Sequence, residues 1–396
     1  MRTLKVYEIY PYAIEIKAKV LDVFESNGKP CAVLSETILF PEGGGQPGDR
    51  GTIGEADVLD VIQANDEILH ILDRKIELGK TSVILDWGRR YDNMQQHTGQ
   101  HLLTAVAQDR FRWATTAFHL GPDLCDIELD TPQISPSMRL ELEEAVIEEI
   151  IANKKVITTS VSLEEYGNMK VRSRGLPDGH SGSVRLVEIE GLDINTCGGT
   201  HLASTSELES IKLLDTESIR GGTRLFFIFG KRVRSRLEAH EKRLQQLRTF
   251  LGRPDDGLVD AVEQRISHEK ELERSLRHAD DELATVYAKL LKDKQSVLLS
   301  EHFENKDSTF LQKLARQILE STNDRLLFIT AEKDGNYFFN LCATPISQAD
   351  IPKLGREVAT LLNGRGGGSG KQFQGKFTEI SKLEEAREMI MHQIIF

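Results

Sequence analysis

The chain has 396 residues, of which 39% are hydrophobic and 28% charged, a composition expected for a soluble globular protein of roughly two to four domains. No stretch approaches the roughly 20 apolar residues of a membrane span, and the first residues lack the apolar core of a signal peptide, so we expect a cytoplasmic protein without membrane contact. The formal net charge of −12 argues against nonspecific binding of nucleic acid over the whole surface. Any polyanion would therefore have to meet a local basic patch.

Residues 1–88 are predicted to form a small β-barrel. Short apolar or alternating runs, separated by glycine, asparagine and aspartate turns, predict strands at residues 13–23, 30–39, 55–62, 68–72 and 81–85. Three successive glycines, residues 43–45, precede Gln46. Such a run permits backbone conformations closed to other residues and leaves amides free to approach a ligand. The same composition also suits an ordinary glycine-rich hairpin, and both interpretations stay open.

Residues 89–230 change to mixed α and β character. Helices are predicted at residues 94–107 and 135–153, the second with Ser137 as its N-cap. Strands are predicted at residues 124–129, 156–161, 183–189, 208–215 and 224–229. Helices that alternate irregularly with hairpin-like strands favour an α+β fold over a doubly wound sheet.

Two pairs of ligand-type side chains lie in this second region. An i,i+4 spacing places His97 and His101 on one helix face, and Cys197 and His201 repeat the offset across two glycines. A lone histidine pair on a half-buried helix often only satisfies local hydrogen bonds, but two matched pairs in a chain with 11 His and 4 Cys favour a metal site. Three imidazoles and one thiolate suit a tetrahedral Zn²⁺ ion, one per chain, although the spacing is not that of a zinc finger.

Residues 231–300 are nearly all helix-forming. A recurring apolar stripe predicts two helices that Pro254 and Gly257 interrupt. Because the connection is short, an antiparallel helical hairpin is favoured over one long rod. Such an arm suits a spacer or a dimer seam, so a homodimer through residues 231–396 is one expectation.

Residues 301–396 are predicted to form an α/β domain with a glycine-rich loop. A helix at 309–321, strands at 325–331 and 336–343, and a helix at 351–362 precede the glycine-rich residues 363–371. Arg365 and Lys371 in this loop suit contact with phosphates, although the order of elements is not that of a P-loop. Other basic patches lie at residues 170–174 and 231–236, and each suits a solvated surface equally well.

Four motifs in order resemble the editing domain of alanyl-tRNA synthetase. They occupy residues 41–49, 97–103, 118–121 and 193–201, and the last ends in Cys-Gly-Gly-Thr-His. As a free-standing chain, the sequence is identified as a member of the AlaX family of alanyl-tRNA editing proteins. Residues 231–396 resemble the C-terminal domain of the synthetase, as in the long form of that family. One departure is Leu39-Phe40 before the first motif, where the family often has Phe-Tyr; by the resemblance, we expect this difference to alter the pocket wall.

The resulting prediction is an α+β protein in four parts: a β-barrel (1–88), a zinc-containing editing domain (89–230), a helical hairpin arm (231–300) and a C-terminal α/β domain (301–396). The resemblance implies zinc-dependent hydrolysis of tRNA(Ala) mischarged with serine or glycine, with zinc on His97, His101, Cys197 and His201. The catalytic candidates are His97, His101, Gln46 and His119. The candidates for binding substrate are Thr37, Gly44, Gly45, Gln46, Thr98, Asp193, Arg365 and Lys371, with Thr37 or Thr98 as partner of the serine hydroxyl.

Two other functions compete with this prediction. Editing domains of threonyl-tRNA synthetase share an HxxxH pair, so the substrate could be another mischarged tRNA. Alternatively, zinc could be purely structural in a tRNA-binding module without catalysis, because a zinc ion with four protein ligands is usually a closed site. The sequence alone does not choose between an anchoring and a catalytic metal.

Overall fold

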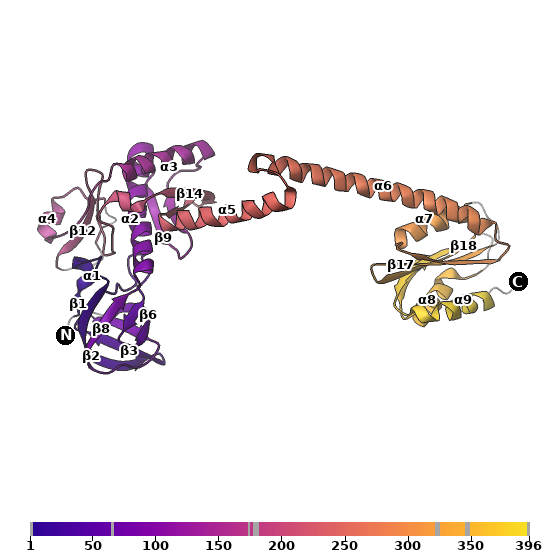
Figure 1. Cartoon of the computed structure of the whole chain (residues 1–396), viewed down its shortest axis with the longest axis horizontal. Coiled ribbons are helices and arrows are strands. Elements are labelled where there is room, and N and C mark those ends of the chain that lie inside the picture. Colours follow the sequence, from indigo (N-terminus) through magenta and orange to yellow (C-terminus); the bar gives the residue numbers. More distant parts are fainter. Residues whose placement is uncertain are drawn as a thin grey trace. The chain divides into compact units, whose positions relative to one another are not determined.

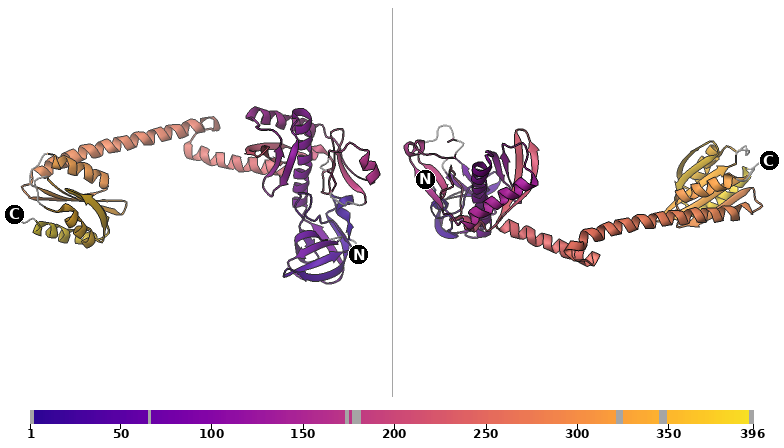
Figure 2. Two further views of the ribbon diagram at one scale, coloured as in Figure 1. Left: turned by 180° about the vertical axis from the view of Figure 1, so that it is seen from behind. Right: turned by 90° about the horizontal axis from the view of Figure 1, so that it is seen from above.

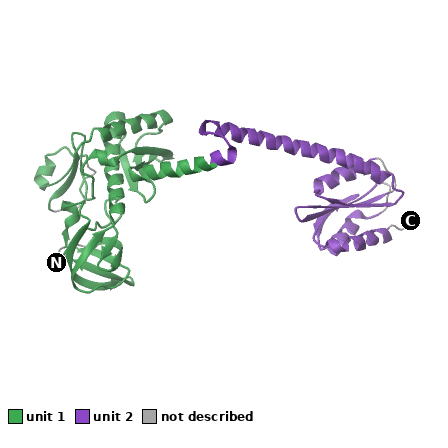
Figure 3. Ribbon diagram, in the orientation of Figure 1, with its two compact units in different colours: residues 1–246 green, residues 247–396 purple. Residues whose placement is uncertain are grey.

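The computed structural model describes residues 3–64, 67–172, 175–176, 182–320, 325–344 and 349–393. The chain divides into two compact units, residues 1–246 and 247–396, shown separately coloured in Figure 3. Both units contain helices and strands, which confirms the predicted α+β class. Among the helices within these described ranges, none is long and apolar enough to cross a membrane.

Unit 1 begins with a closed barrel of strands in the order β2-β3-β7-β6-β5-β8, drawn in indigo in Figures 1 and 2. Its strands are β2 (Glu15–Ser26), β3 (Lys29–Leu34), β5 (Gly51–Ile53), β6 (Ala56–Ala64), β7 (Glu67–Leu72) and β8 (Gly79–Leu85). Alternate residues of β2 such as Ala18 and Val20 point inward and pack with Leu34, Val61 and Val83. Small flanking elements are β1 (Leu4–Lys5), α1 (Val6–Ile9) and β4 (Glu36–Thr37).

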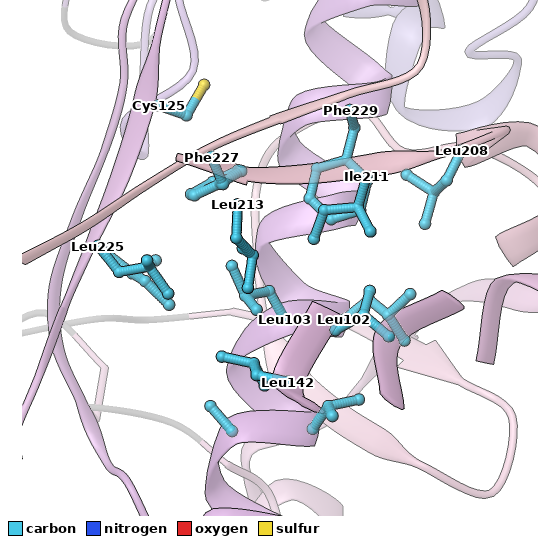
Figure 4. Packing of buried hydrophobic residues seen from close by; sticks show 14 of the residues in the cluster. Leu102, Leu103, Cys125, Leu142, Leu208, Ile211, Leu213, Leu225, Phe227 and Phe229 are labelled. Atoms are coloured by element: carbon cyan, nitrogen blue, oxygen red, sulfur yellow. The ribbon is translucent and has the colours of Figure 1, made fainter. Parts of the chain in front are cut away.

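A long helix, α2 (Trp87–Phe111), follows the barrel and packs with α3 (Pro136–Ile151) on an antiparallel sheet of order β14-β15-β10-β9. The sheet strands are β9 (Thr115–Leu120), β10 (Cys125–Leu129), β14 (Ile211–Ile219) and β15 (Gly222–Phe229). Figure 4 shows Leu102 and Leu103 of α2 facing Ile211, Leu213 and Phe229 in this core. Gly99 permits the close approach, because a Cβ there would lie 2.4 Å from Phe229 Cδ2.

The predicted N-cap of α3 is wrong by two residues. Ser135, not Ser137, caps the helix by accepting a hydrogen bond from the Met138 backbone N–H. Pro136 occupies the first turn, where its missing N–H is not needed, so the cap precedes it.

A second antiparallel sheet, β11-β12-β13, completes unit 1. It contains β11 (Val156–Val161), β12 (Val184–Ile189) and β13 (Asp193–Thr196), with α4 (Leu163–Gly167) after β11 and the 3₁₀ turn η1 (Thr205–Leu208) before β14. The Cys-Gly-Gly-Thr-His segment directly follows β13, so this sheet places Cys197 and His201 beside α2.

Helix α5 (Lys231–Leu251) begins in unit 1, and after the 3₁₀ turn η2 (Asp255–Gly257) the helix α6 (Leu258–Lys292) belongs to unit 2. The break between them lies where Pro254 and Gly257 predict it. Because most of α5 and all of α6 fall in different units, their antiparallel packing stays a prediction.

Unit 2 contains a mixed sheet of order β16-β17-β18-β20-β19, in which only β16 and β17 are parallel. Its elements are β16 (Leu298–Glu304), α7 (Ser308–Leu319), β17 (Leu326–Lys333), β18 (Asn336–Ala343), α8 (Ile351–Leu361), β19 (Arg365–Ser369), β20 (Gln372–Phe377), the 3₁₀ turn η3 (Ile380–Lys382) and α9 (Leu383–His392). Leu326 and Phe328 pack with α8 and α9, whereas Leu327 and Ile329 pack with α6 and α7. Helices thus cover both faces of the sheet.

The predicted glycine-rich loop of this unit is wrong, because residues 365–369 form the edge strand β19. A Cβ at Gly366 would lie 2.4 Å from the Gln374 carbonyl oxygen, and one at Gly368 would lie 2.1 Å from that of Gln372. The glycines therefore allow the strand to lie close against β20, and Arg365 stands exposed at its start.

Candidate metal centre and adjoining cavity

Four ligand-type side chains converge where α2 meets the loop after β13. The ligand atoms of His97, His101, Cys197 and His201 all lie within 4.8 Å of one another. Cys197 Sγ is 3.3 Å from His97 Nε2 and 3.2 Å from His201 Nε2. Tetrahedral bonds of about 2.0–2.3 Å separate ligand atoms by about 3.3–3.6 Å, so the cluster could hold one metal ion.

Two of the imidazoles have hydrogen-bond partners on the nitrogen that faces away from Cys197. His97 Nδ1 lies 2.8 Å from Gln46 Oε1, and His201 Nδ1 lies 3.1 Å from Thr98 Oγ1. If each Nδ1 donates its proton to this oxygen, each Nε2 keeps a lone pair for the metal. Gln46 and Thr98 therefore orient ligands, and both side chains are fully buried.

The third imidazole, His101, faces a carboxylate. Asp193 Oδ2 is 3.8 Å from His101 Nδ1, too far for a hydrogen bond but close enough for electrostatic attraction, and Asp193 Oδ1 is 2.9 Å from Arg172 Nε. Arg172 in turn contacts both carboxylate oxygens of Asp109 at 3.0 Å. Asp193 thus lies behind the cluster, held between a histidine and an arginine.

A tight turn places Gln46 against the cluster. Gly43 and Gln46 exchange backbone hydrogen bonds of 3.1 and 3.0 Å, and the two residues between them, Gly44 and Gly45, both have positive φ. A Cβ at Gly45 would also lie 2.7 Å from the Phe118 ring. Gln46 then accepts from the Thr200 backbone N–H at 3.0 Å and donates to its hydroxyl at 2.8 Å. The glycine-rich motif is therefore a hairpin that positions one amide side chain.

An ion pair without exposed surface fixes this hairpin to α2. Asp49 follows the hairpin, and Arg90 on the first turn of α2 binds its carboxylate through Nε at 3.0 and 3.1 Å and through Nη2. Arg90 also donates to the carbonyl oxygens of Pro11 and Ile38, and Asp49 accepts from the Phe40 N–H. The barrel and the histidine-bearing helix are thereby joined.

The loop that carries Cys197 is held by an arginine and a glycine. Arg185 Nη1 donates to the carbonyl oxygens of Cys197 at 2.6 Å and Gly199 at 2.8 Å. A Cβ at Gly199 would lie 2.3 Å from His97 Cε1, so only glycine lets the loop pass the imidazole.

The electrostatics of the cluster favour the metal-binding protonation state at Cys197 and His201, whereas His101 would have to release a proton to bind a metal. Burial opposes the Cys197 thiolate, but the neighbouring His97 and His201 imidazoles and hydrogen bonds from His101 and His201 bring the Cys197 pKa well below its usual value. Burial lowers the pKa of His201 to about 3, which keeps its ring neutral. For His101, burial opposes charge, yet contacts with Asp193 and Cys197 raise the pKa to about 9. A thiolate and a neutral imidazole are the forms in which these residues bind metal.

A cavity of about 600 Å³ adjoins the cluster. His97, His101 and Cys197 form part of its wall, and the rest includes Gln100, Thr104, Thr115 and Phe118. Gln100 donates to Thr104 Oγ1 at 2.9 Å, and Thr115 donates to the same oxygen at 3.1 Å. Gln100 Oε1 is buried and accepts no hydrogen bond from any described residue. The cavity therefore joins a candidate metal centre to a wall of polar side chains that includes Gln100, whose buried Oε1 has no hydrogen-bond partner among the described residues.

Comparisons with known proteins agree with this site. The family described as the threonyl and alanyl tRNA synthetase second additional domain matches residues 184–226, which include Cys197 and His201. The chain is 38% identical over 361 residues to the alanyl-tRNA editing protein Aarsd1 of Danio rerio, covering 90% of this chain and 87% of that protein. It is 30% identical over 413 residues to the alanyl-tRNA editing protein AlaX-L of Pyrococcus horikoshii, covering 98% of each. The chain belongs to the alanyl-tRNA editing protein family.

A solved structure is also similar to this alanyl-tRNA editing protein in part. The C-Ala domain of alanyl-tRNA synthetase from Aquifex aeolicus has 24% sequence identity and a TM-score of 0.24, and the match covers 24% of this chain and 89% of that domain.

Not every predicted site residue of this editing protein lies at the cavity. His119 does not line this cavity: its neighbour Phe118 does, and His119, on the opposite side of β9, is 71% exposed and 3.6 Å from Asp126. Thr37 of β4 does not line this cavity either: it is fully buried, and its hydroxyl is 2.9 Å from Nε2 of His70 on the barrel strand β7.

The remaining predicted candidates have other settings. Arg365 and Lys371 belong to unit 2, where Lys371 Nζ is 3.5 Å from the Ala349 carbonyl oxygen. In the patch at 231–236, Arg232 pairs with Asp92 and Arg234 with Glu209, while Lys231 and Arg236 are exposed. Two residues of the patch at 170–174, numbers 173 and 174, lie outside the described residues.

The residues that the prediction missed are Gln100, Thr104, Thr115 and Arg185. The first two follow His97 at i+3 and i+7, so helical periodicity alone would have placed them on the face of the histidines. Thr115 and Arg185 are separated from the motifs in sequence, and only the fold brings them to the site.

Proposed function

We propose that this chain is a zinc-dependent hydrolase that removes the amino acid from mischarged tRNA(Ala), with serine as the principal amino acid and glycine, which lacks the hydroxyl, as a much poorer second. The observation that carries the proposal is the convergence of three imidazoles and a thiolate on the wall of a cavity, in a chain that belongs to the alanyl-tRNA editing protein family. The bond broken is the ester that joins the amino acid to the terminal adenosine, and water is the other reactant.

Zinc fits the donor set better than harder ions do. His97, His101, Cys197 and His201 would hold it, because thiolate and imidazole are its preferred ligands and calcium or magnesium would require oxygen. Bound zinc supplies a Lewis acid that polarises a carbonyl or lowers the pKa of water. Gln46, Thr98 and Asp193 contact the three imidazole rings and orient them toward the metal. Loss of such a contact typically weakens metal binding about 10–100-fold.

The cavity wall supports selection of serine. Alanine differs from serine by lacking a hydroxyl, and a merely apolar pocket would reject such an analogue poorly. A pocket that hydrogen-bonds the hydroxyl discriminates by up to about 10⁴-fold, because the smaller substrate leaves buried polar groups unpaired. Gln100, with Thr104 and Thr115 hydrogen-bonded beside it, meets this need and replaces Thr37 and Thr98 as the proposed partner.

We assign binding of the tRNA backbone to exposed cationic side chains away from the cavity. Lys231 and Arg236 of unit 1 and Arg365 of unit 2 are exposed and suit phosphate contacts. A homodimer through residues 231–396 and a cytoplasmic location remain predictions.

Incubation of the purified chain with seryl-tRNA(Ala), with and without a zinc chelator, tests the proposal. We expect ester loss that the chelator abolishes and that added zinc restores. Cys197→Ala should lose both bound zinc and deacylation, whereas Cys31→Ala, a buried cysteine of the barrel, serves as the control. Full activity without metal would contradict a catalytic role of zinc and indicate that zinc is structural. Activity only on another mischarged tRNA would show that tRNA(Ala) is not the substrate.

A further inference from the structure

A second cavity meets the first at the cysteine of the metal cluster. It has a volume of about 970 Å³ and shares Gly175, Thr196, Cys197 and Gly198 with the cavity described above. Of the four ligand residues, only Cys197 lines it. Both cavities lie within unit 1, so their common border is a feature of one compact body.

The border contains a glycine that neither packing nor backbone conformation explains. Gly198 is not among the glycines with positive φ, and a Cβ built on it meets no atom of the described residues within 4 Å. Its neighbour Gly199 differs, because a Cβ there would collide with His97 and Gln46. Glycine at 199 is thus needed by the metal cluster, whereas the glycine at 198 puts no side chain at the border that the two cavities share.

The second cavity combines cationic and apolar side chains. Arg185 keeps its Nε buried and without a hydrogen-bond partner among the described residues, although its Nη1 holds the Cys197 loop. The Lys5 ammonium makes only long contacts among the described residues: its Nζ is 3.6 Å from Glu8 Oε1 and 3.4 Å from Gln63 Oε1. Leu4 and Ile9 are 53% and 58% exposed at the same cavity. Cations beside apolar surface suit a nucleotide, whose phosphate is anionic and whose base has an apolar face.

We propose that the second cavity binds the nucleotide that precedes the terminal adenosine of the tRNA, with its internucleotide phosphate at Lys5 and Arg185. This inference rests on the proposed function. His97 and His101 line only the first cavity, so the ester reacts there, and the polynucleotide must leave on another side. In this proposal the strand crosses at Gly198, which itself presents no side chain, and enters the second cavity. Glu8 lies near the phosphate as well, so the phosphate must compete with it for Lys5, whose contact with Glu8 is long at 3.6 Å.

Two substrates separate this site from the reaction site. Seryl-tRNA(Ala) carries the internucleotide phosphate, whereas 3′-O-seryladenosine carries the same ester without it. For Lys5→Gln we expect the KM for seryl-tRNA(Ala) to rise about tenfold, with kcat, zinc content and hydrolysis of seryladenosine unchanged. The slope of log KM against log salt concentration should fall by about one, as for the loss of one phosphate contact. Lys5→Arg should restore the wild-type KM.

Controls distinguish the site from general effects. Lys17→Gln removes the same charge from β2, at a residue that lines neither cavity, and should change nothing. Gly198→Val should impair hydrolysis of seryl-tRNA(Ala) far more than that of seryladenosine and should retain zinc. Equal effects on both substrates, or none, would overturn the second site while leaving the hydrolase intact. If the wild type hydrolyses neither ester, the proposed function itself fails.

Discussion

The strongest test of the cluster's construction is Gln46→Met. Methionine has nearly the length of glutamine but no carbonyl oxygen, so His97 Nδ1 and the Thr200 N–H, now 2.8 and 3.0 Å from Gln46 Oε1, would lose their common acceptor. Gln46 is fully buried, so we expect no water to replace it. Each unsatisfied donor costs about 1–3 kcal/mol. The cost of leaving the His97 N–H without an acceptor reduces the free energy of metal binding. We therefore predict that zinc binds about 10–100-fold more weakly to the variant.

Competition with a chromophoric chelator at neutral pH measures this affinity directly. Gln95→Met is the matched control, because Gln95 is as buried as Gln46 and lies on α2, the helix that carries His97. Its side chain donates to the Glu207 carbonyl oxygen and accepts from the Lys231 N–H, and it does not contact the cluster. It should lower stability without changing zinc affinity. Unchanged zinc affinity in Gln46→Met, or an equal loss in Gln95→Met, would refute the positioning of His97 by Gln46. Excess zinc should restore much of the deacylation by Gln46→Met.

Three further changes test other parts of the structure. Gln100→Leu should reduce the preference for seryl- over alanyl-tRNA(Ala) by about tenfold in kcat/KM, through loss of one hydrogen bond, while Gln108→Leu, farther along the same cavity wall, should preserve it. Arg90→Met leaves the Asp49 carboxylate buried without its partner and should lower the free energy of unfolding by about 3–5 kcal/mol in urea titrations. Burial lowers the pKa of His70 to about 4, so the unfolded chain takes up a proton at this residue before the folded chain does as the pH falls below about 6.5. The free energy of unfolding of the wild type should therefore drop by about 2 kcal/mol between pH 7 and pH 5. His70→Gln should lose this part of the pH dependence.

Fold elements with a clear period were predictable, and elements defined by tertiary contact were not. Strand β18 lies at the predicted residues, because a buried apolar run follows the turn at Asp334 and Gly335. Strand β5 was missed since three residues are too few to show alternation. The sequence predicts a loop where strand β19 lies, because glycines are unfavourable in an isolated strand, and only the nearby carbonyl groups of β20 explain them.

The four metal-binding candidates were predictable because their spacing and chemistry are local signals. The roles of their neighbours were not. Phe118 and His119 are adjacent in one motif, yet strand geometry sends them to opposite sides, and the sequence does not reveal which side holds the cavity. Gln46 was expected to contact substrate, but its amide is used by His97 and Thr200. Such assignments depend on which buried donors need an acceptor, and that depends on the fold.

The position of the cavity bears on whether the metal centre is structural or catalytic. His97, His101 and Cys197 line the cavity, whereas His201 is not among the described residues of its wall and stands behind them with Thr98. A ligand in the cavity therefore meets one face of the cluster, formed by three of its four side chains. Structural zinc sites are usually closed by protein, while catalytic sites keep a position open to substrate or water. Four protein ligands fill a tetrahedral zinc ion, so the catalytic alternative requires one of the cavity-lining ligands to lengthen or leave its bond to the metal. That alternative predicts that deacylation will require the metal even where folding does not.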